Sequence, residues 1–323
     1  MRIKSLKIND VFRIKSINVE FGTKDNIICM IDENEDPFKE NAFFEVMQIL
    51  FLDSFYKTGG YLCGNGEIQC FCERFDCNFL ISLKGKQEKT EFVYQGEKMT
   101  GQRNGVEEIC FCGEKASAKM QWVLRADYRE IFYPLEMREY GKFNGNGGNN
   151  GMEEVVAAIE MECAEGGWFL LDDQWQILKT KMRKYLADFE GIPFIKEQPL
   201  TINQKGELMF QDRYFILDVE EYFSKDEYMR IQFLYWLATL NMIKRLCEDI
   251  ERDCDLPVFV ENLFENLEQG KDNVLLFEEM RKTGRQIFIF LDKRNAEIEK
   301  NCDKILVKGA NGEYNIFTNN ERK

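Results

Sequence analysis

The feature that most constrains the fold is the segment at residues 26–31, near the start of the chain, in which an uninterrupted apolar run follows Asn26. An apolar run without alternation is typical of a strand that is buried on both faces. An acidic loop at residues 32–36 follows, and then Pro37 and a segment whose apolar residues recur with the spacing of a helix. Strand, loop and helix in this order are typical of the opening of a nucleotide-binding α/β domain.

Further strand and helix patterns divide the sequence into two predicted lobes. The first lobe, residues 1–142, begins with two short strands and continues with a meander of short strands over residues 61–112. Asn and Gly dominate residues 143–151, which we interpret as a flexible linker. The second lobe, residues 152–323, contains a long helix over about residues 225–253 and several strands. The sequence therefore predicts an α/β fold with an N-terminal β-rich lobe and a C-terminal α/β lobe.

Histidine is absent from all 323 residues, which limits the chemistry that the chain can perform. An imidazole base, a His-ligated metal and a Ser-His-Asp triad are all excluded. The 57 acidic residues exceed the 43 Lys and Arg residues and give a net charge of −14, which argues against unaided binding to a nucleic acid backbone. We therefore expect DNA contact only through a partner, or weakly through a local patch such as residues 179–184.

The first residues and the cysteines indicate the compartment. Met1 leads directly into alternating apolar and polar residues rather than into a secretory leader, so we expect a cytoplasmic protein. The longest apolar stretch without charge, residues 231–243, is shorter than the roughly 20 residues that cross a bilayer, and we expect no membrane partner. The 11 cysteines are then expected to be reduced thiols.

Two Cys-x-Cys pairs are the only candidates for a metal site. They are Cys70 with Cys72 and Cys110 with Cys112. On a strand, this spacing directs both thiols of a pair to the same face. If the two strands were neighbours, the four sulfurs would approach the tetrahedral geometry of zinc. The alternative, which we take as the default, is that all four are packing thiols and that no metal is bound.

Several segments together resemble the ATPase head of the SMC/RecF/SbcC branch of ABC-type P-loop proteins. Residues 1–8, 19–22 and 26–28 look like that family's first hairpin and the strand before its P-loop. The remaining matches are residues 256–268 with the Walker B strand and D-loop, 284–290 with the strand that follows, and 222–227 with the signature motif. The resemblance implies an ABC-type P-loop NTPase-like head that lacks the coiled-coil arms.

The P-loop of that family depends on glycines, because its backbone N–H groups must curl around phosphate without Cβ clashes. No glycine occurs between Gly22 and Gly59 in this chain. The resemblance places the degenerate P-loop at Asp32, Glu33, Asn34 and Lys39. The acidic residues put negative charge where a triphosphate approaches, which opposes ATP binding.

The catalytic motifs are altered as well. The resemblance places the family's Mg²⁺-associated Asp at Glu261 and its catalytic Glu at Asn262, whose amide cannot accept a proton from the attacking water. Glu268 replaces the D-loop Asp. Ser224 keeps the signature serine, but Ser224 and Glu227 also form the pattern of a capping box, a local role that needs no nucleotide.

We therefore expect a degenerate pseudo-ATPase without catalytic residues or a cofactor, acting as a protein-interaction or regulatory subunit in a DNA repair or anti-mobile-element system. Its partner would be a second copy of the chain, or an active ATPase or nuclease in a heteromer. The alternative is a functional ATPase of DNA repair that binds ATP and Mg²⁺ at an unconventional phosphate site. Its residues would be Lys39, Glu261 and a carboxylate such as Glu265 or Glu268. A third alternative is a subunit that binds ATP without hydrolysing it.

Overall fold

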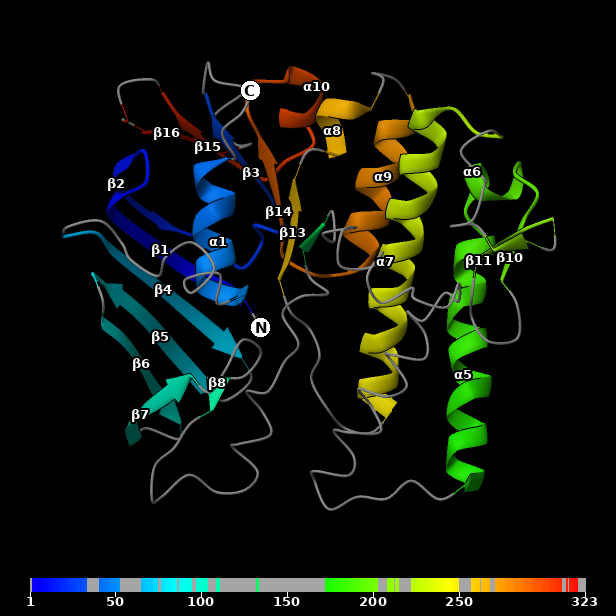
Figure 1. Ribbon diagram of the computed structural model, residues 1–323, viewed down its shortest axis with the longest axis horizontal. Coiled ribbons are helices and arrows are strands. Elements are labelled where there is room, and N and C mark those ends of the chain that lie inside the picture. The colour runs from blue at the N-terminus through cyan, green and yellow to red at the C-terminus, as the bar shows by residue number, and fades with distance from the viewer. Residues whose placement is uncertain are drawn as a thin grey trace. The chain divides into compact units, whose positions relative to one another are not determined.

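A computed structural model describes much of the chain as two compact units (Figure 1). Unit 1 consists of Met1–Pro134, Asp255–Glu265 and Gly284–Lys323, and unit 2 of Leu135–Cys254 and Asn266–Thr283. The described residues are 2–33, 41–52, 65–74, 77–85, 87–94, 97–103, 109–110, 132–133, 172–202, 208–211, 213–214, 222–249, 257–261, 263–267, 271–309, 312 and 314–318. The predicted linker at 143–151 and the lobe boundaries beside it lie outside these residues.

The apolar runs of the sequence form the middle of a six-stranded sheet in unit 1, with the strand order β16-β15-β3-β14-β13-β9. The strands are β3 (Ile27–Asp32), β9 (Phe132–Tyr133), β13 (Val258–Glu261), β14 (Ile287–Leu291), β15 (Lys304–Lys308) and β16 (Tyr314–Thr318). All neighbours are parallel except β15 and β16, which are antiparallel. Every residue of β3, β13, β14 and β15 is buried, as expected of parallel strands that are covered on both faces.

A second, antiparallel sheet in unit 1 has the order β2-β1-β4-β5-β6-β7-β8. Its strands are β1 (Arg2–Val11), β2 (Ile14–Glu20), β4 (Glu67–Arg74), β5 (Cys77–Lys84), β6 (Gln87–Tyr94), β7 (Glu97–Arg103) and β8 (Ile109–Cys110). The consecutive pairing from β4 to β8 confirms the predicted meander. The turn between β1 and β2 includes Phe12, whose φ of 50° lies in the left-handed region that side chains rarely adopt.

The side chain of Gln286 links β1 to the segment that enters β14. Gln286 is buried, and its Oε1 accepts a hydrogen bond from the Ile3 backbone N–H at 2.7 Å. Its Nε2 donates to the Ile3 carbonyl at 3.0 Å. The pairing of β1 with β4 shifts register between Ile3 and Ser5, so the amide of Gln286 satisfies backbone groups at an irregular position of the strand.

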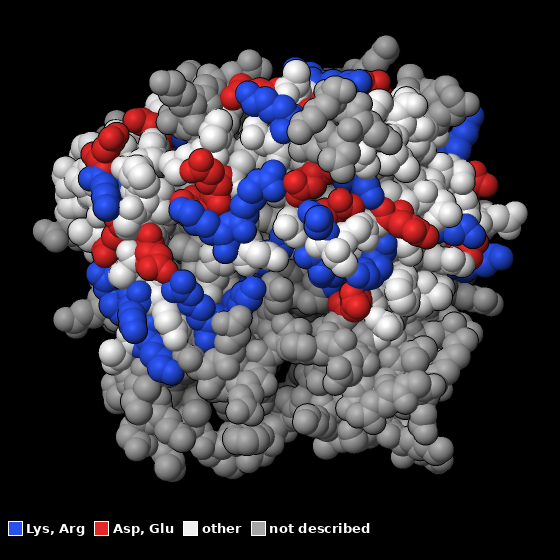
Figure 2. All heavy atoms as spheres, turned by 180° about the vertical axis from the view of Figure 1, so that it is seen from behind, with Lys and Arg blue, Asp and Glu red and all other residues white. Residues whose placement is uncertain are grey.

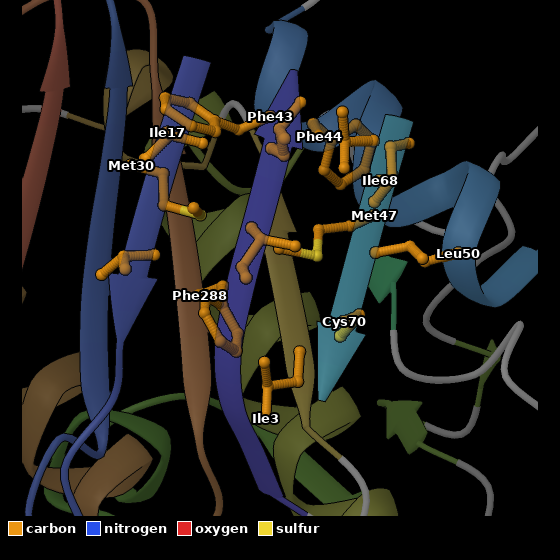
Figure 3. Packing of buried hydrophobic residues seen from close by; sticks show 14 of the residues in the cluster. Ile3, Ile17, Met30, Phe43, Phe44, Met47, Leu50, Ile68, Cys70 and Phe288 are labelled. Carbon is orange, nitrogen blue, oxygen red and sulfur yellow. The ribbon is translucent and has the colours of Figure 1, made fainter. Parts of the chain in front are cut away.

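Helix α1 (Ala42–Leu52) packs into the core that the two sheets of unit 1 share. Figure 3 shows its side chains among residues of β1, β3, β4 and β14. Aromatic contacts fix this packing: the ring centroids of Phe44 and Phe290 lie 5.1 Å apart, and those of Phe43 and Tyr314 lie 5.5 Å apart. The core therefore holds the N-terminus of α1 close to the end of β3.

Unit 2 contains three longer helices, α5 (Asp172–Glu190), α7 (Lys225–Asp249) and α9 (Lys271–Lys282). Helix α7 contacts both α5 and α9, and its position confirms the long helix predicted to begin at Lys225. The shorter elements are α6 (Pro193–Lys196), β10 (Leu200–Ile202), β11 (Leu208–Phe210) and β12 (Arg213–Tyr214). Two short helices follow strands of the six-stranded sheet along the chain: α8 (Leu263–Asn266) follows β13, and α10 (Ala296–Glu299) follows β14. Among all the helical residues described, none form a span both long and apolar enough to traverse a bilayer.

Candidate functional site

The candidate site lies where β3 ends, at the position that the resemblance assigns to the P-loop. Asp32 is the last residue of β3, and its side chain is completely buried. The Nζ atom of Lys308 donates a hydrogen bond to its Oδ1. Arg13, from the turn between β1 and β2, donates from Nη2 to Oδ2 at 3.0 Å. Lys308 is the register partner of Asp32 on β15, so the parallel pairing itself brings the two charges together.

Side chains of Asp32 and Asn41 accept hydrogen bonds from the N–H groups at the N-terminus of α1. The N–H of Ala42 donates to Oδ2 of Asp32 at 3.0 Å, and the N–H of Phe43 donates to Oδ1 of Asn41 at 3.0 Å. Asn41 also donates from Nδ2 to the carbonyl of Leu291 at 2.9 Å, at the end of β14. The first N–H groups of a helix are the groups that bind phosphate in nucleotide-binding folds. Two of them are already occupied here by an internal carboxylate and an internal amide.

Asp32 is held in its ionised form. Burial acts to raise the pKa of the Asp32 carboxyl, but the hydrogen bonds from Lys308, Ala42 and Arg13, together with the charge of Lys308, hold that pKa below its usual range. An ionised carboxylate at the positive end of α1 is also favoured by the helix dipole. Asp32 therefore adds a permanent negative charge to this position.

Tyr314 lies beside the same cluster. Its hydroxyl is buried and has no hydrogen-bond partner among the residues that the structure describes. Burial, and then the negative charge of Asp32, raise the pKa of Tyr314 well above its usual range, so the phenol stays protonated. Tyr314 is the register partner of Lys308 on β16, and its ring packs against Phe43 of α1.

Of the other predicted P-loop positions, the structure describes only Glu33. The backbone N–H of Glu33 donates a hydrogen bond to the carbonyl of Lys308 at 3.1 Å. Asn34 and Lys39 lie outside the described residues. The unconventional phosphate site that was predicted to use Lys39 therefore stays a prediction.

Glu261, the position of the Mg²⁺-associated Asp, ends β13 and is buried. It is the register partner of Phe290, which in turn pairs with Met30. Glu261 and Asp32 therefore lie at the same edge of the sheet on strands that β14 separates. Asn262 and Glu268 lie outside the described residues, so the predicted loss of the catalytic base stays a prediction.

The signature position belongs to unit 2 and has the reciprocal hydrogen bonds of the predicted capping box. The N–H of Glu227 donates to Oγ of Ser224 at 3.2 Å, and the N–H of Ser224 donates to Oε2 of Glu227 at 2.9 Å. The Ser224 hydroxyl also donates to Oε2 at 2.9 Å. Ser224 is thus already engaged in starting helix α7.

The first Cys-x-Cys pair lies in β4, with the Sγ atoms of Cys70 and Cys72 at 3.6 Å and both side chains buried. The hydrogen bond with Cys72, and then burial, raise the pKa of the Cys70 thiol. Cys110 is in β8, and Cys112 lies outside the described residues. Strands β5, β6 and β7 separate β4 from β8, so the neighbouring strands that a four-sulfur site requires are not formed.

The basic run proposed as a local DNA patch is in α5, and its charge is partly neutralised. Arg183 is paired with Glu190 at 3.1 Å. Nearby in unit 2, Arg245 of α7 is paired with Asp188 at 2.7 Å. In Figure 2, Lys and Arg side chains lie next to Asp and Glu side chains over much of the described surface of that face.

Sequence reasoning did not predict the residues around Asp32. It missed the ion-pair partners Lys308 and Arg13, and it also missed Asn41 and Tyr314. The one available signal was the lysine that ends the apolar run at residues 305–307, because a charge at the end of a buried strand needs a partner.

Comparisons with known proteins were made for both sequence and structure. No family model matches the sequence, and no curated protein matches it. Among solved structures, an SMC head bound to the C-winged helix domain of ScpA is similar over 100% of both chains, with a TM-score of 0.55 and 9% identity. The RecF recombination mediator with ATP matches 98% of this chain and 99% of its own, at 12% identity and a TM-score of 0.48. An Smc head from Pyrococcus furiosus, bound to the C-terminal domain of ScpA, matches 98% and 96%, at 11% identity and a TM-score of 0.46. The first of these similarities extends over the whole chain, and we conclude that the chain has the fold of an SMC head, as its sequence predicted.

Proposed function

We propose that this chain is a protein-interaction or regulatory subunit that keeps the SMC head fold without using ATP, in a DNA repair or anti-mobile-element system. The observation that carries the proposal is the buried, ionised Asp32 at the N-terminus of α1. It occupies donors that a nucleotide phosphate would need, and it already pairs with Lys308 and Arg13.

Occupation of these groups supports the loss of nucleotide binding. The N–H groups of Ala42 and Phe43 donate to Asp32 and Asn41, so they are not available to a phosphate. Lys308 and Arg13 both donate to Asp32, so their charges are already directed to an internal carboxylate.

The sequence supports the same conclusion independently. No glycine occurs between Gly22 and Gly59, so a phosphate-cradling loop of the usual kind has no residues to form it. Asn262 stands at the position that the resemblance assigns to the catalytic base. Binding and hydrolysis would therefore be lost for separate reasons.

A protein partner is the simplest remaining role for such a fold. One SMC head to which this chain is similar was solved in complex with a domain of ScpA. By analogy, we infer that this chain also works through a bound protein, either a second copy or an active ATPase or nuclease. The net charge of −14 favours contact with DNA through that partner.

Calorimetric titration of the full chain with Mg-ATP tests the nucleotide part of the proposal. We expect no binding heat up to millimolar nucleotide. A micromolar Kd would contradict the proposal and favour the alternative of an ATPase with an unconventional phosphate site.

Purification of the tagged full chain from its native host tests the partner part. We expect a second protein, or a second copy, in a fixed ratio after size-exclusion chromatography. A monomer without any stoichiometric partner would count against the proposed role, whatever the titration gives.

A further inference from the structure

The surroundings of Asp32 have the composition of a complete oxyanion site. A lysine ammonium, an arginine guanidinium and a helix N-terminal N–H all donate to one carboxylate. These are the donor types with which proteins bind free carboxylates and phosphates. The site is built into the interior, because Lys308 is only 5% exposed and Asp32 is completely buried.

Both oxygen atoms of the Asp32 carboxylate are engaged. Oδ1 of Asp32 accepts from Lys308, and Oδ2 accepts from both Arg13 and Ala42. The three donors converge on the space that the carboxylate fills, so an external oxyanion in that space can accept from the same three groups.

Arg13 is the partly exposed member of the cluster. Its side chain is 28% exposed, and it comes from the turn that follows β1. Lys308 and Asp32 are buried.

We propose that Asp32 is an internal ligand that permanently fills an oxyanion site formed by Lys308, Arg13 and the Ala42 N–H. When the Asp32 carboxylate is removed, this site binds a small external oxyanion of the carboxylate or phosphate type. The inference rests on the proposed function in one respect, because in both the Asp32 carboxylate lies where a phosphate would otherwise bind.

The test compares Asp32→Ala with Asp32→Asn. The alanine variant loses the charge and opens space for an anion, whereas the asparagine variant loses the charge but keeps the space filled. We expect sodium formate and sodium phosphate to raise the thermal unfolding midpoint of Asp32→Ala in a saturable manner, relative to sodium chloride at equal ionic strength. Asp32→Asn, the unmodified chain and the double variant Asp32→Ala with Lys308→Met should show no saturable rise.

Parallel responses of Asp32→Ala and Asp32→Asn to these anions would overturn the inference. If Asp32→Ala does not fold in chloride, its refolding from urea is measured in each salt. Recovery in phosphate or formate supports the inference, and failure in every salt overturns it. The ATP titration uses the unmodified chain and no added anion, so either experiment can fail without deciding the result of the other.

Discussion

Replacement of Lys308 by methionine should destabilise unit 1 strongly at neutral pH. The change keeps the length and the apolar part of the side chain but removes the cation that faces the buried Asp32. Loss of one partner from a buried ion pair costs about 3–5 kcal/mol, because the other charge stays in the interior without compensation. Arg13 and the Ala42 N–H still contact Asp32, so we expect the lower end of this range, about 3 kcal/mol.

The loss of stability in Lys308→Met should depend on pH in a defined direction. In the unmodified chain the folded-state pKa of Asp32 is depressed, so its stabilising contribution is present above the unfolded pKa of about 3.9 and is lost as the pH falls through the folded value. Removal of Lys308 takes away two of the contributions that lower the folded-state pKa of Asp32, so this pKa rises relative to that of the unmodified chain. Protonation then relieves the uncompensated charge of Asp32 at a higher pH in the variant, and the loss of stability should shrink as the pH is lowered from 7 towards 4.

The assay is thermal and urea unfolding followed by circular dichroism at pH 7 and pH 4.5, with Lys293→Met as the control. Lys293 is exposed, and a change there should stay within about 0.5 kcal/mol. A loss of about 3 kcal/mol corresponds to a midpoint about 6–12 °C lower for a unit of this size. A loss below about 1 kcal/mol at pH 7, or an equal deficit at both pH values, would refute the importance of this ion pair.

Two further substitutions test contacts that hold the site in place. Asn41→Ala removes the cap of α1 and the hydrogen bond to Leu291, and should lower the free energy of unfolding by about 1–2 kcal/mol in urea denaturation; an unchanged value would show that the cap is dispensable. Gln286→Leu leaves both backbone groups of Ile3 without their buried partner, and should cost at least about 2 kcal/mol, with increased hydrogen exchange at the Ile3 amide. Wild-type exchange at that amide would contradict the role given to Gln286.

The elements that the sequence predicted well are those encoded locally. The apolar run that becomes β3, the hairpins from β4 to β8 and the start of α7 each depend on a periodicity or a cap within a few residues. The acidic loop was also recognised, and it was interpreted as a charge that repels phosphate. Local pattern alone was sufficient for these features.

The interior of the site was not predictable in the same way. Lys308 meets Asp32 across 276 positions of sequence, and nothing local to either residue specifies that β15 is the neighbour of β3. The sequence therefore indicated a negative charge near the P-loop position but not that Asp32 turns inward and is neutralised. Arg13 and Asn41 were missed for the same reason, because their roles depend on where Asp32 and Leu291 lie in the folded chain.

The position of β3 between β14 and β15 has a consequence for synthesis on the ribosome. Both neighbours of β3 come from residues 287–308, more than 250 residues after β3, so β3 has no strand to pair with when it leaves the exit tunnel. At about 5–20 residues per second, the interval from Asp32 to Lys304 lasts roughly 15 to 55 s. During that time a strand that is apolar from Ile27 to Ile31 must be shielded by the β1–β2 hairpin and α1 or by a chaperone. Unit 1 is therefore expected to complete its folding only after β15 has been synthesised.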